Sequence, residues 1–102
     1  MFPRIEFHYP VTIIGMDTHA KIIDFSLNGF YIETRQVDSL SKGQRVNLAL
    51  KLPDEIKSIL IKAQLVYLDE RGFGCQFTEL APDAKAVLER CFDLHAGMLP
   101  ID

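Results

Sequence analysis

Residues Ile5–Ile13, with the sequence IEFHYPVTI, decide the fold class. Every odd position in this stretch is apolar or aromatic, whereas every even position is polar or proline. Because successive side chains of a β-strand point to opposite faces, this alternation predicts a strand with one buried side and one solvent-facing side. Pro10 cannot donate a hydrogen bond to a neighbouring strand, so we expect it at a sheet edge or at a bulge.

Five further strands are expected, each bounded by residues that favour turns. They cover residues 20–25, 29–34, 45–52, 59–68 and 73–77. The connections include a turn at 15–18, a polar link at 26–29, an irregular loop at 36–43, the strand-ending Pro53-Asp54 and a hairpin turn at 69–72. Because no helix separates these evenly spaced strands, the pattern predicts an antiparallel barrel or sandwich rather than a parallel sheet.

The apolar residues change to helical spacing near the end of the chain. Pro82 suits the first turn of a helix, and Asp83 complements the helix dipole. Gly97 and Pro100 are expected to end this helix. Its apolar stripe consists of Ala84, Val87, Leu88, Cys91 and either Leu94 or His95. We expect one C-terminal helix that covers an open end or a face of the barrel.

Size and charge limit the classes of protein. The chain has 102 residues, which are enough for one domain over 1–102 and too few for two independent cores. Its 11 Lys and Arg against 14 Asp and Glu give a net charge of −3. This balance argues against a DNA- or RNA-binding protein, which needs a basic patch. No apolar run approaches the roughly 18 residues of a membrane span and no signal peptide is evident, so we expect a cytoplasmic protein without membrane insertion.

Side chains able to ligate a metal do not form the close pairs typical of zinc sites. The candidates are His8, His19, His95, Cys75 and Cys91. In a protein that is not exported, both cysteines are expected to stay reduced. Ser26 lacks the glycine-flanked turn of a nucleophilic serine, and a chain of this length has little room for a deep pocket beside its core. The sequence therefore predicts neither an enzyme nor a bound metal or cofactor.

The connection Asp24-Phe25-Ser26-Leu27-Asn28-Gly29 gathers polar residues between two expected strands. Asp, Ser and Asn side chains bond their own backbone in turns, and Gly29 permits a positive φ. A stabilised hairpin turn is therefore one interpretation. If Asp24 and Ser26 instead point outward, they can bond a polar ligand. Arg4 beside them can then clamp a phosphate or the O6 and N7 edge of a guanine.

The chain resembles PilZ domains at this turn and at several positions around it. Asp24-x-Ser26-x-x-Gly29 matches their D/N-x-S-x-x-G motif. Further matching landmarks are Phe2-Pro3-Arg4-Ile5 followed by Pro10-Val11, Leu40-x-x-Gly43, the alternating Val46-x-Leu48-x-Leu50, and Gly72-Phe73-Gly74-Cys75-Gln76-Phe77. Together they cover about residues 2–94, and their order makes the resemblance more specific than the motif alone.

The resemblance implies an all-β fold, a six-stranded antiparallel β-barrel of the split-barrel type with one C-terminal α-helix. It also implies binding of the bacterial second messenger cyclic di-GMP, often as a stacked dimer of the dinucleotide. The ligand-binding residues that it implies are Arg4, Asp24, Ser26 and Gly29, with His8 and Asn28 as auxiliary candidates.

PilZ domains also carry an R-x-x-x-R motif that wraps around the ligand, and this sequence shows one arginine of the pair. Counted from Pro10-Val11, Arg4 matches the second arginine, and the first position falls one residue before Met1. Taking Arg4 as the first arginine instead puts His8 in the second place and disturbs the spacing to Pro10. Hydrogen bonds to a charged partner are worth about 1.5–3 kcal/mol each, so loss of a bidentate arginine weakens binding by about one to three orders of magnitude.

Three functions are consistent with these residues. The first, which we expect, is a receptor whose binding of cyclic di-GMP changes what it presents to a protein partner of unknown identity, as a monomer or a homodimer. The second is a degenerate PilZ-like interaction module that docks a protein and no longer binds nucleotide. The third is a small barrel of another lineage that binds single-stranded nucleic acid. The acidic charge and the lack of a basic aromatic face oppose this third function.

Overall fold

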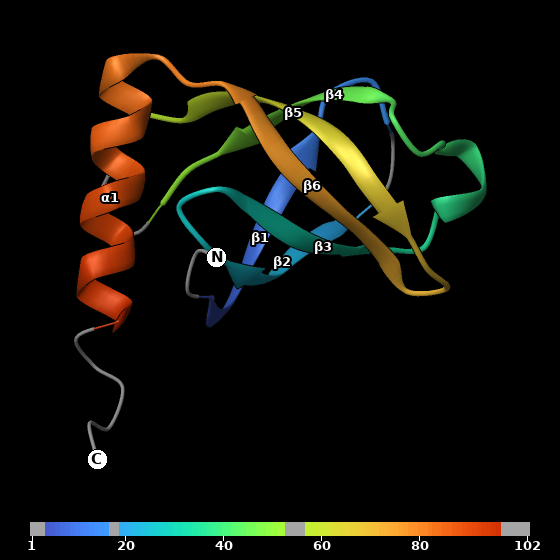
Figure 1. Cartoon of the computed structure of the whole chain (residues 1–102), viewed down its shortest axis with the longest axis horizontal. Coiled ribbons are helices and arrows are strands. Elements are labelled where there is room, and N and C mark those ends of the chain that lie inside the picture. Colours follow the sequence, from blue (N-terminus) through green and yellow to red (C-terminus); the bar gives the residue numbers. More distant parts are fainter. Residues whose placement is uncertain (1–3, 17–18, 53–56, 97–102) are drawn as a thin grey trace.

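The computed structural model describes residues 4–16, 19–52 and 57–96. Its strands are β1 (Ile5–Ile13), β2 (Ala20–Phe25), β3 (Gly29–Thr34), β4 (Arg45–Leu50), β5 (Ile59–Leu68) and β6 (Gly72–Glu79). A short 3-10 helix, η1 (Val37–Ser39), precedes β4, and the helix α1 (Pro82–Ala96) follows β6. The strands close into an antiparallel barrel in the order β1-β2-β3-β6-β5-β4, and Figure 1 shows α1 beside one end of it. The predicted fold class is confirmed.

Strand β1 closes the barrel because it pairs with β2 on one side and with β4 on the other. Its pairing with β4 runs through Thr12 and Ile13. Its register with β2 shifts between Glu6 and Tyr9, and the regular pairing resumes at Tyr9. Pro10 itself pairs in register with Lys21, and a closed barrel leaves β1 no free edge, so neither the bulge at Pro10 nor the edge position is observed.

The predicted strand boundaries differ from the structure in β4 and β6. Strand β4 ends at Leu50, two residues before the predicted end, although Leu52 is only 3% exposed. Apolar alternation follows burial rather than the hydrogen-bond ladder, so it continues past the end of this strand. Strand β6 extends to Glu79, beyond the predicted 73–77. The loop predicted at 36–43 contains η1.

Aromatic side chains fill the barrel beside the 26–29 turn. Phe25 is fully buried, and its ring centroid lies 5.7 Å from that of Phe7 and 5.4 Å from that of Phe30. The ring of Phe92 in α1 meets it edge-on at 5.6 Å. Such aromatic pairs contribute about 0.5–1.5 kcal/mol beyond their buried area. This cluster packs α1 against the barrel and holds the end of β2 in place.

The apolar stripe of α1 differs from the prediction at one position. Leu88 is 1% exposed, and Phe92 is buried beside it, whereas Leu94 is 60% exposed. At 100° per residue, Phe92 lies about 40° around the helix from Leu88 and Leu94 about 120°. The prediction that Leu94 faces the barrel is therefore wrong, and Phe92 takes its place. The side chain of His95, the alternative, lies outside the described residues.

Several other predictions fall partly or wholly outside the described residues. These are Asp17 and Thr18 of the first turn, the strand-ending Pro53-Asp54, and the helix-ending Gly97 and Pro100. The two cysteines, Cys75 and Cys91, are both buried. Among residues 4–16, 19–52 and 57–96, no helix is long and apolar enough to cross a membrane.

Candidate functional site

Ser26 holds the turn between β2 and β3 from the inside. It is 1% exposed, and its Oγ accepts hydrogen bonds from the N–H groups of Asn28 and Gly29, both at 3.2 Å. The N–H of Ser26 donates to the carbonyl oxygen of Gly29 at 3.0 Å. The hydroxyl is turned inward because it satisfies backbone groups of the turn. The hairpin interpretation is therefore confirmed for Ser26, and an outward-pointing hydroxyl is not observed.

Gly29 is required for a reason that differs from the predicted one. It does not adopt a positive φ, which among the described glycines is found at Gly15 and Gly43. A Cβ atom at Gly29 would instead lie 2.0 Å from the carbonyl oxygen of Cys75 in β6. The close approach of two backbones, rather than a left-handed turn, accounts for this glycine.

Asn28 joins the same turn to β6. Its carbonyl oxygen accepts the N–H of Phe77 at 2.9 Å, and its Oδ1 accepts a bond from Nε2 of Gln76 at 3.4 Å. The auxiliary candidate Asn28 is therefore part of the barrel's own hydrogen bonding. Together with Ser26 it fixes the position of the turn at the end of β2.

Arg4 and Asp24 form an ion pair on the outer wall of the barrel. Nη1 of Arg4 lies 2.6 Å from Oδ1 of Asp24, although the two residues are twenty positions apart in the chain. The side chains are 43% and 35% exposed. The structure thus brings together a guanidinium, which only donates hydrogen bonds, and a carboxylate, which accepts them, at a solvent-facing surface. The predicted juxtaposition of these two residues is confirmed.

His8 lies on the outward side of β1 and pairs with Glu6. Its Nε2 lies 3.1 Å from Oε1 of Glu6, and both side chains are exposed. Glu6 is in turn the register partner of Asp24 in β2. The auxiliary candidate His8 therefore contacts Glu6, and Glu6 lies opposite Asp24 of the candidate site.

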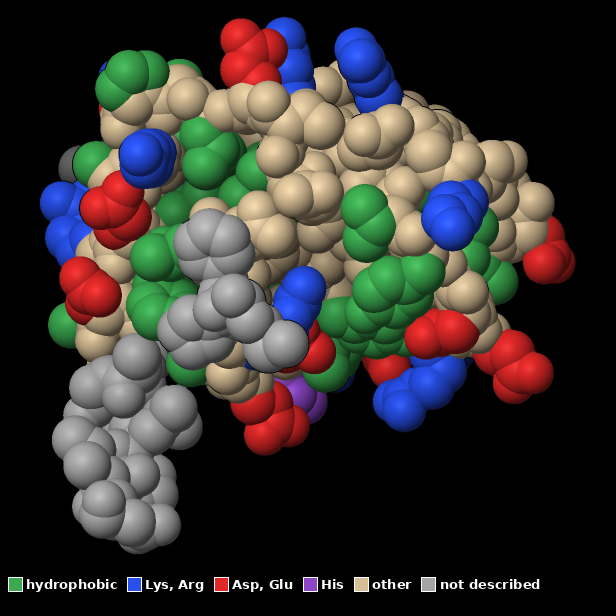
Figure 2. Space-filling model, viewed as in Figure 1, with side chains coloured by type: hydrophobic (Ala, Val, Ile, Leu, Met, Phe, Trp, Pro, Cys, Tyr) green, Lys and Arg blue, Asp and Glu red, His purple; other side chains and the backbone are tan. Residues whose placement is uncertain are grey.

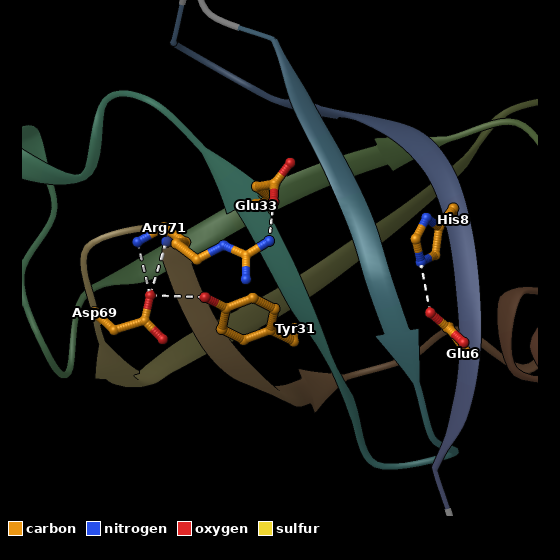
Figure 3. A network of polar contacts seen from close by, with 7 residues as sticks. Glu6, His8, Tyr31, Glu33, Asp69 and Arg71 are labelled. Carbon is orange, nitrogen blue, oxygen red and sulfur yellow. Dashed lines mark hydrogen bonds and ion pairs between the residues drawn. The ribbon is translucent and has the colours of Figure 1, made fainter.

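Tyr31 in β3 belongs to a polar cluster that the sequence did not single out (Figure 3). Its hydroxyl donates to Oδ1 of Asp69 at 2.7 Å, and the same oxygen accepts the N–H groups of Arg71 and Gly72. Nη2 of Arg71 also donates to Glu33 at 3.1 Å. The bond from Tyr31, followed by that from the Arg71 backbone, lowers the pKa of Asp69. Burial, followed by the bond to Asp69, raises the pKa of Tyr31.

Two further observations concern catalysis and metals. Burial raises the pKa of the Cys75 thiol to about 11, so the thiolate that acts as a nucleophile is scarce at neutral pH. In the described part of the chain, no three His, Cys, Asp or Glu residues lie together as metal ligands.

One open hollow of the barrel surface lies apart from the Arg4–Asp24 ion pair. An open hollow of about 750 Å³ lies near the start of β2, and Lys21, Glu33 and Arg71 are among its lining residues. Neither Arg4 nor Asp24 lines this hollow. This hollow is therefore separate from the ion pair.

Comparison with solved structures shows the same fold in a longer protein. The structure of the Bacillus subtilis inhibitor of motility (MotI/DgrA) matches with a TM-score of 0.78 at 18% sequence identity. The match covers 96% of this chain and 51% of that chain, so this chain spans about half the length of that structure. At this identity the similarity concerns the fold. Comparison with curated protein sequences finds no match.

Comparison with protein families supports the resemblance that the turn motif suggested. The model of the PilZ domain matches residues 1–94. This range contains the whole barrel, the Asp24–Gly29 turn and most of α1. The chain therefore belongs to the PilZ domain family.

Proposed function

We propose that this PilZ domain binds cyclic di-GMP on the outer wall of its barrel and passes the level of this second messenger on to a protein partner. PilZ domains generally act as receptors or adaptors for cyclic di-GMP. The observation that carries the proposal is the solvent-facing ion pair between Arg4 and Asp24, which joins the segment before β1 to the Asp24–Gly29 turn.

The two side chains are chemically complementary to the dinucleotide. The ligand offers anionic phosphates and the guanine O6 and N7 acceptors, to which the guanidinium of Arg4 donates. It also offers guanine N–H donors, which the carboxylate of Asp24 accepts. Without ligand the two groups satisfy each other. An exposed ion pair is worth only about 0–1 kcal/mol, so the ligand displaces it at small cost.

Ser26 and Gly29 act on the ligand through the turn in this proposal. Ser26 bonds the turn amides, and Gly29 lets β3 approach β6. Both keep Asp24 at the end of a rigid hairpin. They are therefore positioning residues, and Arg4 and Asp24 make the direct contacts.

Calorimetric titration with cyclic di-GMP tests the proposal. We expect saturable binding to the wild-type chain and a loss of at least about tenfold in affinity for Arg4→Ala, because charged hydrogen bonds are worth about 1.5–3 kcal/mol each. Asp24→Ala is expected to lose affinity similarly. Arg45→Ala is the matched control, because Arg45 is an exposed arginine on β4. Equal affinity in Arg4→Ala and Arg45→Ala contradicts the assigned site.

A degenerate interaction module is the second candidate, and one observation favours it. The hydroxyl of Ser26 is buried and already bonded to the turn, so it contributes no free group to a ligand. In this case the wild-type chain gives no heat with cyclic di-GMP even at high micromolar concentration. A protein partner would then remain bound to a variant that carries both Arg4→Ala and Asp24→Ala.

A further inference from the structure

Four residues form one row across the outer wall of the barrel, beginning at Asp24. In the strand pairing, Asp24 of β2 lies opposite Tyr31 of β3, and Tyr31 lies opposite Gly74 of β6. Gly74 in turn lies opposite Tyr67 of β5. Strands β2, β3, β6 and β5 are consecutive neighbours in the barrel. The row therefore leads directly from the carboxylate of the candidate site to two aromatic side chains.

Gly74 allows the ring of Tyr67 to lie on the backbone of β6. A Cβ atom at Gly74 would meet Cε1 of Tyr67 at 2.2 Å, so the ring occupies the space that a side chain would need. The Tyr67 ring also stacks with that of Tyr31, with centroids 6.1 Å apart and planes inclined by 23°. We call this surface the tyrosine shelf, and it consists of Tyr31, Gly74 and Tyr67.

The tyrosine shelf is partly open to solvent, and a hydrogen bond holds one of its two tyrosines. Tyr67 is 45% exposed. The hydroxyl of Tyr31 is held by Asp69. Figure 2 shows hydrophobic side chains between acidic and basic ones over β3 and β6, where the shelf lies. A stacked aromatic pair with one exposed ring and one held by a hydrogen bond suits a flat ligand group, because part of its side-chain freedom is already lost before binding.

Electrostatics link the tyrosine shelf to the ion pair. Burial raises the pKa of Tyr67, the charge of Arg4 opposes that rise, and the charge of Asp24 adds to it. Both members of the ion pair therefore lie close enough to act on the Tyr67 hydroxyl. The strand pairing places Tyr31 of the shelf opposite Asp24, whose carboxylate pairs with Arg4, so a group lying on the shelf would lie beside donors and acceptors of the kind that recognise guanine.

Stabilisation of the sheet alone does not account for Gly74 beneath the two stacked tyrosines. Cross-strand aromatic pairs do stabilise sheets by about 0.2–1 kcal/mol. A glycine in the middle of a strand, however, weakens that strand and often marks the close approach of a ligand or backbone. Gly74 is such a residue, and its effect is to present a flat aromatic surface to solvent beside Asp24.

We propose that the tyrosine shelf stacks one guanine base of the dinucleotide whose polar groups are held by Arg4 and Asp24. This inference rests on the proposed function and adds Tyr67 as the main stacking residue and Gly74 as its positioning residue. Stacking on a tyrosine ring is general for bases, because each base has a π-face. Arg4 and Asp24 then supply the preference for guanine.

Calorimetric titration of three shelf variants with cyclic di-GMP tests the inference. Tyr67→Ala removes the ring and is expected to weaken binding by about 5- to 150-fold, the range that corresponds to about 1–3 kcal/mol per stacked base. Tyr67→Phe removes only the hydroxyl and keeps the ring that stacks on the base. Its affinity is therefore expected to stay within about threefold of wild type. Gly74→Ala keeps both tyrosines but displaces the ring, so its affinity should fall as well.

The outcomes separate this inference from the proposed function. Binding that is lost in Arg4→Ala but unchanged in Tyr67→Ala and Gly74→Ala overturns the stacking role and leaves the function intact. No binding by the wild-type chain overturns both. Thermal denaturation of each variant serves as the folding control. If Tyr67→Ala does not fold, a wild-type affinity in the folded Gly74→Ala variant is sufficient to overturn the inference.

Discussion

Asp24 and Ser26 belong to the same motif but have different roles in the structure. Asp24 faces solvent and Arg4 neutralises it, whereas Ser26 is consumed by the turn that carries Asp24. The sequence predicted that these residues come together, but it could not assign which of them point outward. Side-chain orientation in a turn depends on the hydrogen bonds that the turn itself needs.

Replacement of Gly29 tests the close approach of β3 and β6. We expect Gly29→Ala to destabilise the protein by about 1–3 kcal/mol or more, because its Cβ would overlap a backbone carbonyl that cannot move aside. Gly74→Ala is the matched control, since its Cβ meets the ring of a movable tyrosine. Urea denaturation of both variants measures the difference. A larger loss in Gly74→Ala than in Gly29→Ala contradicts this explanation.

The carboxylate of Asp69 gives the β5–β6 hairpin a dependence on pH. Its pKa is lowered by the hydrogen bond from Tyr31 and by the Arg71 backbone. A carboxylate with a lowered pKa stabilises the fold above its unfolded pKa of about 4, and this contribution is lost as the pH falls through the folded pKa. We expect the urea midpoint of wild type to fall more steeply below about pH 4 than that of Asp69→Asn. Parallel curves for the two proteins contradict the prediction.

At the level of elements, two β-bulges decide which residues face the candidate site. In β2 the register shifts between Ile22 and Asp24, so Asp24 faces outward and Phe25 inward. In β5 it shifts between Leu65 and Tyr67, which exposes Tyr67. Strict alternation would bury Asp24 in β2 and Tyr67 in β5. The motif resemblance still identified Asp24, whereas no local pattern identified Tyr67.

The helix α1 offers a direct comparison of one buried and one exposed leucine. Leu88 is 1% exposed, so Leu88→Ala should destabilise the protein by about 2–5 kcal/mol through lost burial and a residual cavity. Leu94 is 60% exposed, and Leu94→Ala should stay within about 0.5 kcal/mol of wild type. Thermal denaturation with a common reference temperature distinguishes the two. Similar losses in both variants would place Leu94 in the packed interface and contradict the structure.

At the level of the whole molecule, the closed barrel presents the candidate site on a rigid wall. Four neighbouring strands carry the row from Asp24 to Tyr67, and a closed barrel has no free edge at which these strands could separate. Arg4 precedes β1 and is the ligand-binding candidate outside the strands and the turn. Ligand binding is therefore expected to reorient Arg4 more than the barrel.

The sequence predicted the barrel better than its closure. Alternation and turn residues identified the strands because both are local properties of the chain. The pairing of Thr12 with Ala49, which joins β1 to β4, is a long-range contact that no local pattern specifies. The resemblance to PilZ domains implied a six-stranded barrel, and the structure supplied the strand order. The row across four strands could be found only once that order and its bulges were known.

An NMR titration of the ¹⁵N-labelled chain with cyclic di-GMP tests the central claim most directly. We predict saturable chemical-shift changes at Arg4, at residues 24–29 and along β3 and β6, with small changes in α1. A chain that shows no shifts at saturating ligand, or shifts confined to α1, would contradict binding on this wall of the barrel.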